Sequence, residues 1–185
     1  MSPLPPRDLS LAEVDRLFRG SEGRPSAHRL GASSGGHAYG QHLSITNAGL
    51  MDRMQADGRN GKVALFTAFI TRADMVEAGQ DALNSAEGKW ARHQLFQAPK
   101  TDQHPKGSHN GMRASIYHLG RVRRVRYAGG QGMMPVGDYL LILDRDDSRE
   151  TGLHIQTFIP TMRQSIPAEL ALVYTKTGAP FSQGP

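Results

Sequence analysis

The chain has 185 residues, of which 38% are hydrophobic and 21% are charged, and this length suits one domain of ordinary size with tails. The mean hydropathy is -0.48 and no apolar run approaches the roughly 20 residues of a membrane helix, so an integral membrane protein is excluded. The absence of cysteine excludes disulfide scaffolds, thiolate metal sites and cysteine nucleophiles. The fold must therefore be stabilised by packing alone.

The positive charge is concentrated in one stretch of the chain. The formal net charge is +5, and between Arg113 and Tyr127 there are five arginines and no acidic residue. The rest of the chain therefore sums to zero. Such a surplus indicates either a face that binds an anion, above all nucleic acid, or a solvated strand. If the stretch is such a binding face, the residues that we expect to bind substrate are Arg121, Arg123, Arg124 and Arg126.

The first part of the chain predicts a short helix followed by a linker. Ser10 and Glu13 form a capping-box pattern, and apolar residues follow at helical spacing as far as Gly20. Residues 21–36 are rich in Gly, Ser and Pro, which is typical of a linker. The start of the chain lacks the basic-then-apolar pattern of a cleavable signal peptide, so we expect none.

The middle of the chain predicts helices around one strand. Residues 37–54 favour a helix, or a helical pair broken near Asn47–Gly49. Residues 63–70 are β-branched and aromatic, as in a strand, and residues 71–93 predict one capped helix. The polar residues 97–111 predict a loop.

The second half predicts strands. Residues 114–119 and 121–127 are expected as two strands split at Gly120, and residues 138–143 and 153–159 as a long hairpin. In the last of these strands, alternation assigns two sets of side chains to opposite faces. The first set is His154, Gln156 and Phe158, and the second is Leu153, Ile155, Thr157 and Ile159.

Helices followed by an antiparallel sheet indicate the α+β class. We divide the chain into a helix and linker at residues 1–34, a folded domain at residues 35–162, and a C-terminal extension at residues 163–185.

Metal and nucleotide motifs are weak in this sequence. His37 and His42 are five residues apart, which does not point two ligands the same way on a helix, and His104 and His109 lie near Asp102 in the predicted loop. The glycines at residues 129–132 lack the pattern of a phosphate-binding loop. We predict no metal and no cofactor.

Metal-free cleavage of a phosphodiester needs a base, a cation for the developing charge and a further hydrogen-bonding group. His42 and Arg53 offer the first two, eleven residues apart. On a straight helix they would lie about 16 Å apart, so they can meet at one phosphate only if the segment bends. Thr157 could supply the third group.

Four short motifs, in the same order along the chain, resemble the bacterial RNase A-like toxin domain. This domain forms the C-terminal part of contact-dependent growth inhibition toxins and related polymorphic toxins. The motifs are GGHAYGQHLSITNAGLMDRM at residues 35–54, FTAFIT at residues 66–71, Ala82–Asn84 with Trp90, and QTFIP at residues 156–160.

The resemblance implies a small kidney-shaped ribonuclease without disulfides, with an active site at His42, Arg53 and Thr157. It also implies transphosphorylation through a 2′,3′-cyclic phosphate. His37 matches a leading His of the family, whose alternative role is packing at a helix start. The family usually has Tyr at the position of Ile159. Either another hydroxyl or imidazole substitutes for it, or the activity is weakened or altered. The candidate substitutes are Tyr127, Tyr139, His118 and His154.

The implied partners are RNA, tRNA included, and a cognate immunity protein of acidic character. The implied location is secretion or delivery into the cytoplasm of target bacteria, as a monomer or a toxin–immunity heterodimer. Two alternatives remain: a non-catalytic nucleic-acid-binding module, and another toxin enzyme such as an ADP-ribosyltransferase. The second fits loosely, because its two candidate glutamates, Glu150 and Glu169, lie in loop-like settings.

Overall fold

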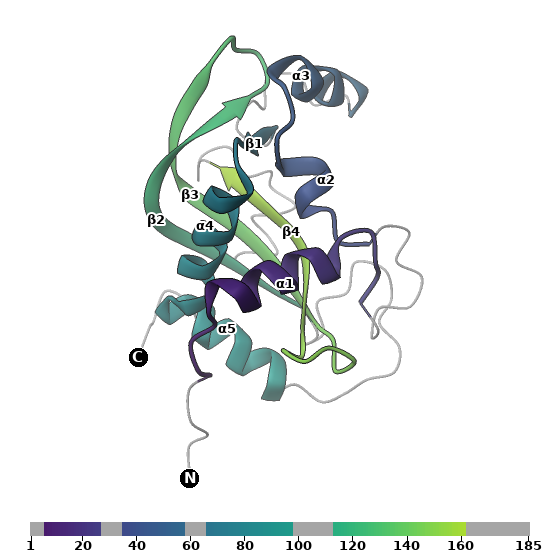
Figure 1. The fold of residues 1–185 in the computed structure, drawn as a ribbon, viewed down its shortest axis with the longest axis vertical. Helices are drawn as coiled ribbons and strands as arrows, with labels where there is room; N and C mark the ends of the chain where they lie inside the picture. The colour runs from purple at the N-terminus through teal and green to yellow at the C-terminus, as the bar shows by residue number, and fades with distance from the viewer. Residues whose placement is uncertain (1–5, 27–34, 58–65, 98–112, 162–185) are drawn as a thin grey trace.

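A computed structural model describes residues 6–26, 35–57, 66–97 and 113–161, as five helices and four strands (Figure 1). The helices are α1 (Leu11–Ser21), α2 (Ala38–His42), α3 (Asn47–Ala56), α4 (Arg72–Asn84) and α5 (Ala86–Gln97). The strands are β1 (Thr67–Phe69), β2 (Arg113–Tyr127), β3 (Met133–Arg145) and β4 (Leu153–Thr161). They form one antiparallel sheet in the order β1-β2-β3-β4, which confirms the α+β prediction.

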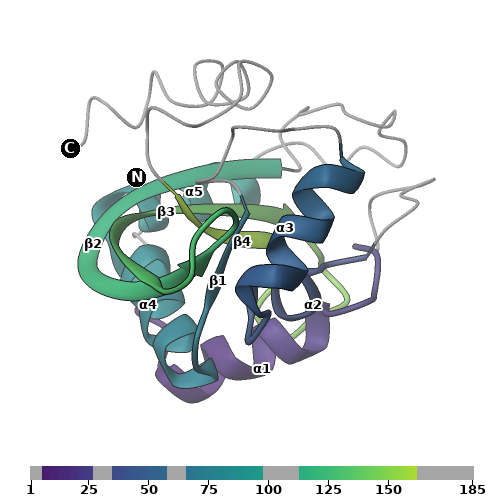
Figure 2. The ribbon, with the colours of Figure 1, turned by 90° about the horizontal axis from the view of Figure 1, so that it is seen from above.

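The main core lies between the helices and one face of the sheet, which we call the inner face. Residues of α1, α2, α4 and α5 pack there against Ile116, Leu141, Ile155 and Phe158, and Figure 2 shows α1 and α4 together on that side of the sheet. Ring centroids of Phe18, Phe69 and Tyr139 lie 5.7, 5.3 and 5.8 Å from that of Phe158. The opposite face, the outer face, carries a separate apolar cluster of Leu140, Ile142 and Ile159.

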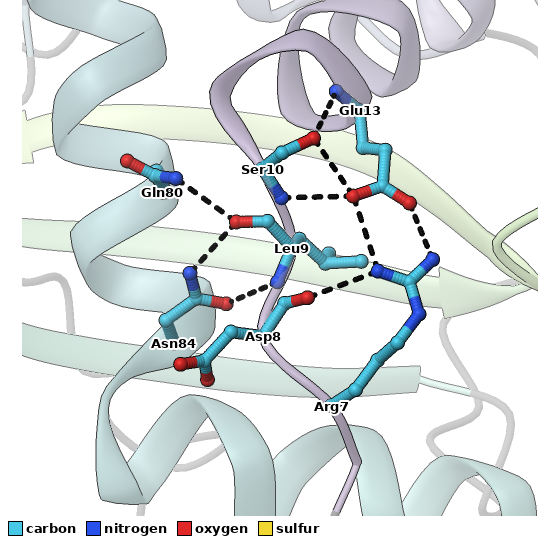
Figure 3. Close-up of polar contacts among 7 residues, drawn as sticks. All are labelled: Arg7, Asp8, Leu9, Ser10, Glu13, Gln80 and Asn84. Carbon is cyan, nitrogen blue, oxygen red and sulfur yellow. Dashed lines mark hydrogen bonds and ion pairs between the residues drawn. The ribbon is translucent and has the colours of Figure 1, made fainter.

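The predicted first helix is confirmed, and it belongs to the main core. The amide of Glu13 donates to the Ser10 hydroxyl and the Glu13 carboxylate accepts from the Ser10 amide, so the capping box is complete (Figure 3). Asn84 of α4 donates to the Leu9 carbonyl and accepts from the Leu9 amide, both at 2.8 Å. The segment that precedes α1 is therefore fastened to α4.

The prediction of one helix over residues 71–93 is wrong, because the chain breaks at Ser85. Ser85 has an extended backbone, and its hydroxyl accepts from the amide of Gly88 at 3.0 Å, which begins α5. A Cβ at Gly88 would lie 2.0 Å from the Ala82 carbonyl, so only glycine allows this close turn between the helices.

The prediction of two strands split at Gly120 is also wrong, because β2 is continuous through it. Pairing with β3 skips from Leu119 to Arg123, which leaves the intervening residues in a bulge. A Cβ at Gly137 would lie 3.3 Å from the Gly120 carbonyl. The two glycines thus let the strands bend sharply together (Figure 1).

Simple alternation fails in β4. The hairpin of β3 and β4 is confirmed, but its register changes so that Leu143 pairs with Ile155 and Ile142 pairs with Thr157, which leaves Gln156 as a bulge. Ile155 therefore faces the inner core, whereas Thr157 shares the outer face with its partner Ile142. The predicted sharing of one face by Ile155 and Thr157 is wrong.

Several expectations fall outside the described residues, among them the loop after residue 97 and the extension at 163–185. In the described ranges, none of the helices has the length and apolar character needed to cross a membrane.

Truncation of Phe158 tests the ring cluster. We expect Phe158→Ala to lower the free energy of unfolding by about 3–5 kcal/mol, because it removes a fully buried ring and leaves a cavity. Leu11→Ala, at a side chain that is 45% exposed, is the control and should cost less than about 1 kcal/mol. Urea denaturation followed by circular dichroism measures both. Equal costs would contradict this account of the core.

Candidate active site

The segment from His37 to Met54 is a pair of helices joined by a sharp turn at residues 43–46. Ser44 has a positive φ of 56°, and the hydroxyl of Thr46 accepts from the amide of Gly49 at 3.1 Å, which caps α3. The helical pair is confirmed, but the predicted break near Asn47–Gly49 is wrong, because those residues form the first turn of α3.

This turn brings Arg53 back onto the end of α2. One guanidinium nitrogen of Arg53 donates to the Gln41 carbonyl at 2.5 Å, and another donates to the Gln41 side-chain oxygen at 2.9 Å. Gln41 directly precedes His42, so the separation of about 16 Å expected on a straight helix does not arise. Three of the five guanidinium N–H groups are not used by these two bonds.

His42 is held at the end of α2 by strand β1. Its side chain is 4% exposed, and its Nδ1 lies 3.0 Å from the carbonyl oxygen of Thr67. Because a carbonyl can only accept, Nδ1 must carry the proton, and in the neutral ring Nε2 is then an acceptor. The Thr67 carbonyl thus selects the tautomer in which Nε2 can act as a base.

His37 begins α2 beside the edge of the sheet. Its amide donates to the Gln156 carbonyl of β4 at 3.1 Å, and its ring centroid is 6.3 Å from that of His42. His37, His42 and Arg53 therefore form one group, which we call the His–Arg cluster.

Burial and positive charge act together on the imidazoles of this cluster. Burial is the main cause that lowers the pKa of His42 to about 3, and the charges of Arg53 and His37 lower it further. Burial also lowers the pKa of His37, with a smaller contribution from Arg53. At neutral pH both rings are therefore uncharged, and Arg53 supplies the positive charge.

Thr157 lies on the outer face of β4, directly after the residue whose carbonyl accepts from His37. Its side chain is 4% exposed, and its hydroxyl oxygen is buried without a hydrogen-bond partner. Within the described residues, no hydrogen bond joins this hydroxyl to His42 or Arg53. The structure thus brings His37, His42 and Arg53 together. Thr157 follows directly after Gln156, the β4 residue that the His37 amide contacts.

Ile159 packs with Leu140 and Ile142, and none of the candidate substitutes for the missing Tyr contacts His42 through a described hydrogen bond. The Tyr139 hydroxyl donates within the bend of the sheet, to the carbonyls of Arg121 and Val136.

The other three substitutes lie in different places. Tyr127 pairs with Thr67, but its ring and hydroxyl lie against Gly130. His118 pairs with Tyr139 on β3, in the electrostatic range of Glu87. His154 pairs with Asp144 and shares the outer face with Thr157.

The arginines of β2 divide into two kinds. Arg123 is 8% exposed and makes ion pairs with Glu77 at 3.3 Å and Asp81 at 3.5 Å, so its charge is neutralised within the protein. Arg121 and Arg124 are exposed, and Arg126 donates to the carbonyl of Ile45 in the turn between α2 and α3.

No ion pair with a carboxylate, among the residues described, involves the last three of these arginines. Arg126 thus contacts the turn that joins the helix of His42 to the helix of Arg53.

No group of three or more His, Cys, Asp or Glu that could hold a metal ion occurs in the part of the chain that the structure describes. His104, His109 and Asp102 lie outside it. Two positioning residues, Thr67 and Gln41, escaped the sequence reasoning. The backbone carbonyl of Thr67 binds His42, and the backbone carbonyl and side-chain oxygen of Gln41 bind Arg53. Because every residue has a backbone carbonyl, such contacts cannot be predicted from residue type.

No protein-family model matches the sequence, and no curated protein matches it. Among solved structures, a chain in the crystal structure of the CdiA-CT/CdiI complex from Y. kristensenii 33638 is similar, with 24% sequence identity and a TM-score of 0.47. The match covers 69% of this chain and 100% of that chain.

The titration of His42 tests its environment. NMR of the folded protein should show the ring of His42 uncharged down to about pH 3, well below its ordinary value of 6.5. The unfolded chain then binds more protons between these two values, so the free energy of unfolding should rise with pH across that window and level off above it. His42→Asn should reduce this slope. A ring that titrates near 6.5 in the folded protein would contradict the arrangement.

Proposed function

We propose that the protein is a metal-independent ribonuclease that cleaves RNA by transphosphorylation. The observation that carries the proposal is the convergence of His42, His37 and Arg53, which a sharp turn and strand β1 fix at one place. The reaction needs at least a base, here His42 in a defined tautomer, and a cation with N–H groups that can bind the phosphate, here Arg53.

The reaction assigns a role to each member of the cluster. Nε2 of His42 accepts the proton of a ribose 2′-hydroxyl, and the 2′-oxygen bonds to the adjacent phosphorus as the bond to the 5′-oxygen breaks. Arg53 neutralises the charge on the pentacovalent phosphate. His37 takes up a proton from water when the phosphate anion binds beside it, and delivers that proton to the departing 5′-oxygen. Thr157 orients the phosphate from β4.

The low pKa of the two imidazoles is consistent with these roles. Arg53 and the neighbouring imidazole are among the causes that lower the pKa of His42, and a phosphate between them opposes both. Binding of an anion therefore moves the pKa of His42 back toward neutrality, where proton transfer is most effective. Binding of the substrate phosphate thus raises the pKa of the His42 base.

The proposed biological role rests on the resemblance of the four ordered sequence motifs to those of the bacterial RNase A-like toxin domain. We infer that the protein is a toxin delivered into the cytoplasm of competing bacteria, where it inhibits growth by degrading RNA, with tRNA as one candidate. Its producer then needs an immunity protein, and the exposed Arg121 and Arg124 favour an acidic one. A monomer, or a heterodimer with that protein, satisfies this role.

Cleavage with EDTA present tests the chemistry. We expect loss of RNA but not of single-stranded DNA, because DNA lacks the attacking hydroxyl. His42→Ala and Arg53→Ala should each lower the rate at least about 100-fold, and His37→Ala less. The matched control is His93→Ala, at a half-buried His of α5 that stacks on Trp90. Gel assays of timed digests, with circular dichroism of each variant, measure these effects.

The same assay separates the alternatives. Intact RNA, or equal loss of RNA and DNA, would refute the proposal. Unchanged RNA affinity without turnover in the native protein would indicate a binding module. Release of nicotinamide from NAD would indicate an ADP-ribosyltransferase.

The arginines of β2 give a second prediction. Arg124→Gln and Arg126→Gln should each reduce the slope of log affinity for RNA against log salt by about one phosphate contact. Arg123→Gln should leave the slope unchanged and lower the melting temperature, because it breaks the ion pairs with Glu77 and Asp81. Fluorescence anisotropy of the inactive His42→Ala protein measures the slopes. If all three variants kept the slope of the parent His42→Ala protein, this strand would not contact RNA.

A further inference from the structure

Helix α2 starts at a histidine that does not cap it. The residue before a helix often carries a short polar side chain, which accepts a hydrogen bond from an amide of the first turn. His37 occupies this position in α2, and its side chain makes no capping bond. The first-turn amides of Tyr39 and Gly40 therefore need an acceptor from another part of the chain.

That acceptor is the carboxylate of Glu22, which directly follows α1. One oxygen of Glu22 accepts from the amide of Tyr39 and the other from the amide of Gly40, both at 2.8 Å. The backbone of Glu22 forms a bridge with Gly36, the residue before His37, which holds the carboxylate in place. A Cβ at Gly40 would lie 2.9 Å from a Glu22 oxygen, so glycine leaves room for this contact.

Because Glu22 caps the helix, the ring of His37 is left for other contacts. Its Nδ1 lies 3.4 Å from the carbonyl oxygen of Gly35, which also accepts from the side-chain amide of Gln156 at 3.1 Å. A carbonyl can only accept, so this contact favours a proton on Nδ1. Nε2 can then carry the second proton, which is the one that a general acid delivers.

The charge of Glu22 also acts on His37. Burial is the main cause that lowers the pKa of His37, and the charge of Arg53 lowers it further. The Gly35 carbonyl and the Glu22 carboxylate act in the opposite direction. The neighbouring ring of His42 is uncharged at neutral pH. Glu22 thus supplies the negative charge that opposes the effects of burial and of Arg53.

We propose that Glu22 is a positioning residue for the general acid of the reaction, because it caps α2 in place of His37 and stabilises the charge that the His37 ring acquires. This inference rests on the proposed ribonuclease function. When the substrate phosphate binds and His37 takes up a proton from water, the carboxylate favours the resulting imidazolium. Glu22 acts through His37 and transfers no proton itself.

The pH dependence of RNA cleavage tests this role. Glu22→Gln keeps the size of the side chain and one oxygen acceptor but removes the charge. We expect kcat/KM at pH 7 to fall about 3- to 10-fold, and the basic limb of its pH profile to move to lower pH, because less His37 is protonated. Glu22→Asp keeps the charge and should restore the position of the limb. A loss by the same factor at every pH would indicate a purely structural cap and overturn the inference.

The matched control is Glu13→Gln, which makes the same substitution in the capping box of α1. It should lower the melting temperature and leave the pH profile unchanged. Gly40→Ala is a second probe that changes no charge, because its Cβ displaces the Glu22 carboxylate. It should move the basic limb in the same direction as Glu22→Gln. If Glu22→Gln does not fold, an unchanged limb in Gly40→Ala would overturn the inference.

A second measurement does not depend on cleavage. NMR titration of the His37 ring should give a lower pKa in Glu22→Gln than in the native protein. An unchanged pKa of His37, with RNA still cleaved, would overturn the inference and leave the ribonuclease proposal intact. A lower pKa, with no cleavage of RNA by the native protein, would support the link between Glu22 and His37 and refute the ribonuclease. An equal change in Glu13→Gln would show an effect of net charge and overturn the inference.

Discussion

The arrangement of the site depends on the hydrogen bond between His42 and the carbonyl of Thr67. Strand β1 has only three residues, yet Thr67 pairs with Tyr127 of β2, its hydroxyl donates to the Pro160 carbonyl of β4, and its carbonyl fixes the His42 ring. The first and last strands of the sheet are thereby joined through one residue, and α2 is attached where they meet. A buried imidazole is stable there because the carbonyl satisfies Nδ1, and the same bond decides the tautomer that the proposed reaction needs.

The second constraint is electrostatic. Arg53 is half-buried and its positive charge lies beside two imidazoles whose pKa values burial lowers. Among the described residues its hydrogen bonds go to the neutral oxygens of Gln41, and the Asp57 carboxylate acts on it electrostatically without a described ion pair. A partly buried guanidinium in this setting can accept an anion. Arg123 shows the contrast on β2, since two carboxylates from α4 neutralise it. Among the described residues, the fold thus gives Arg123 two ion pairs and Arg53 none.

Local signals were enough to predict several elements, and long-range contacts decided the rest. The Ser10–Glu13 pattern specified the start of α1, because the capping bonds form within four residues. The turn-rich residues before β4 specified the hairpin in the same way. By contrast, alternation could not reveal the bulge at Gln156, whose cause is the register with β3. For the site, the spacing of His42 and Arg53 predicted that the segment must bend if both residues are to meet. The bend itself depends on the positive φ of Ser44 and the cap at Thr46. The contact of Thr67 could not be predicted, because it uses a backbone carbonyl that every residue possesses.

The same bulge connects the fold to the proposed active site. Without it, Thr157 would share the inner face with Ile155, and Phe158 would turn to the outer face, so a hydroxyl would take the place of the ring in the main core. The extra residue turns Thr157 to the outer face, beside Ser115 and His154, while the carbonyl of Gln156 accepts from the amide of His37. A single inserted position therefore turns the Thr157 hydroxyl to the outer face and leaves Phe158 in the main core. Because the hydrogen bonds of β3 hold the register on either side, the position of that hydroxyl is set by the backbone and not by a flexible side chain.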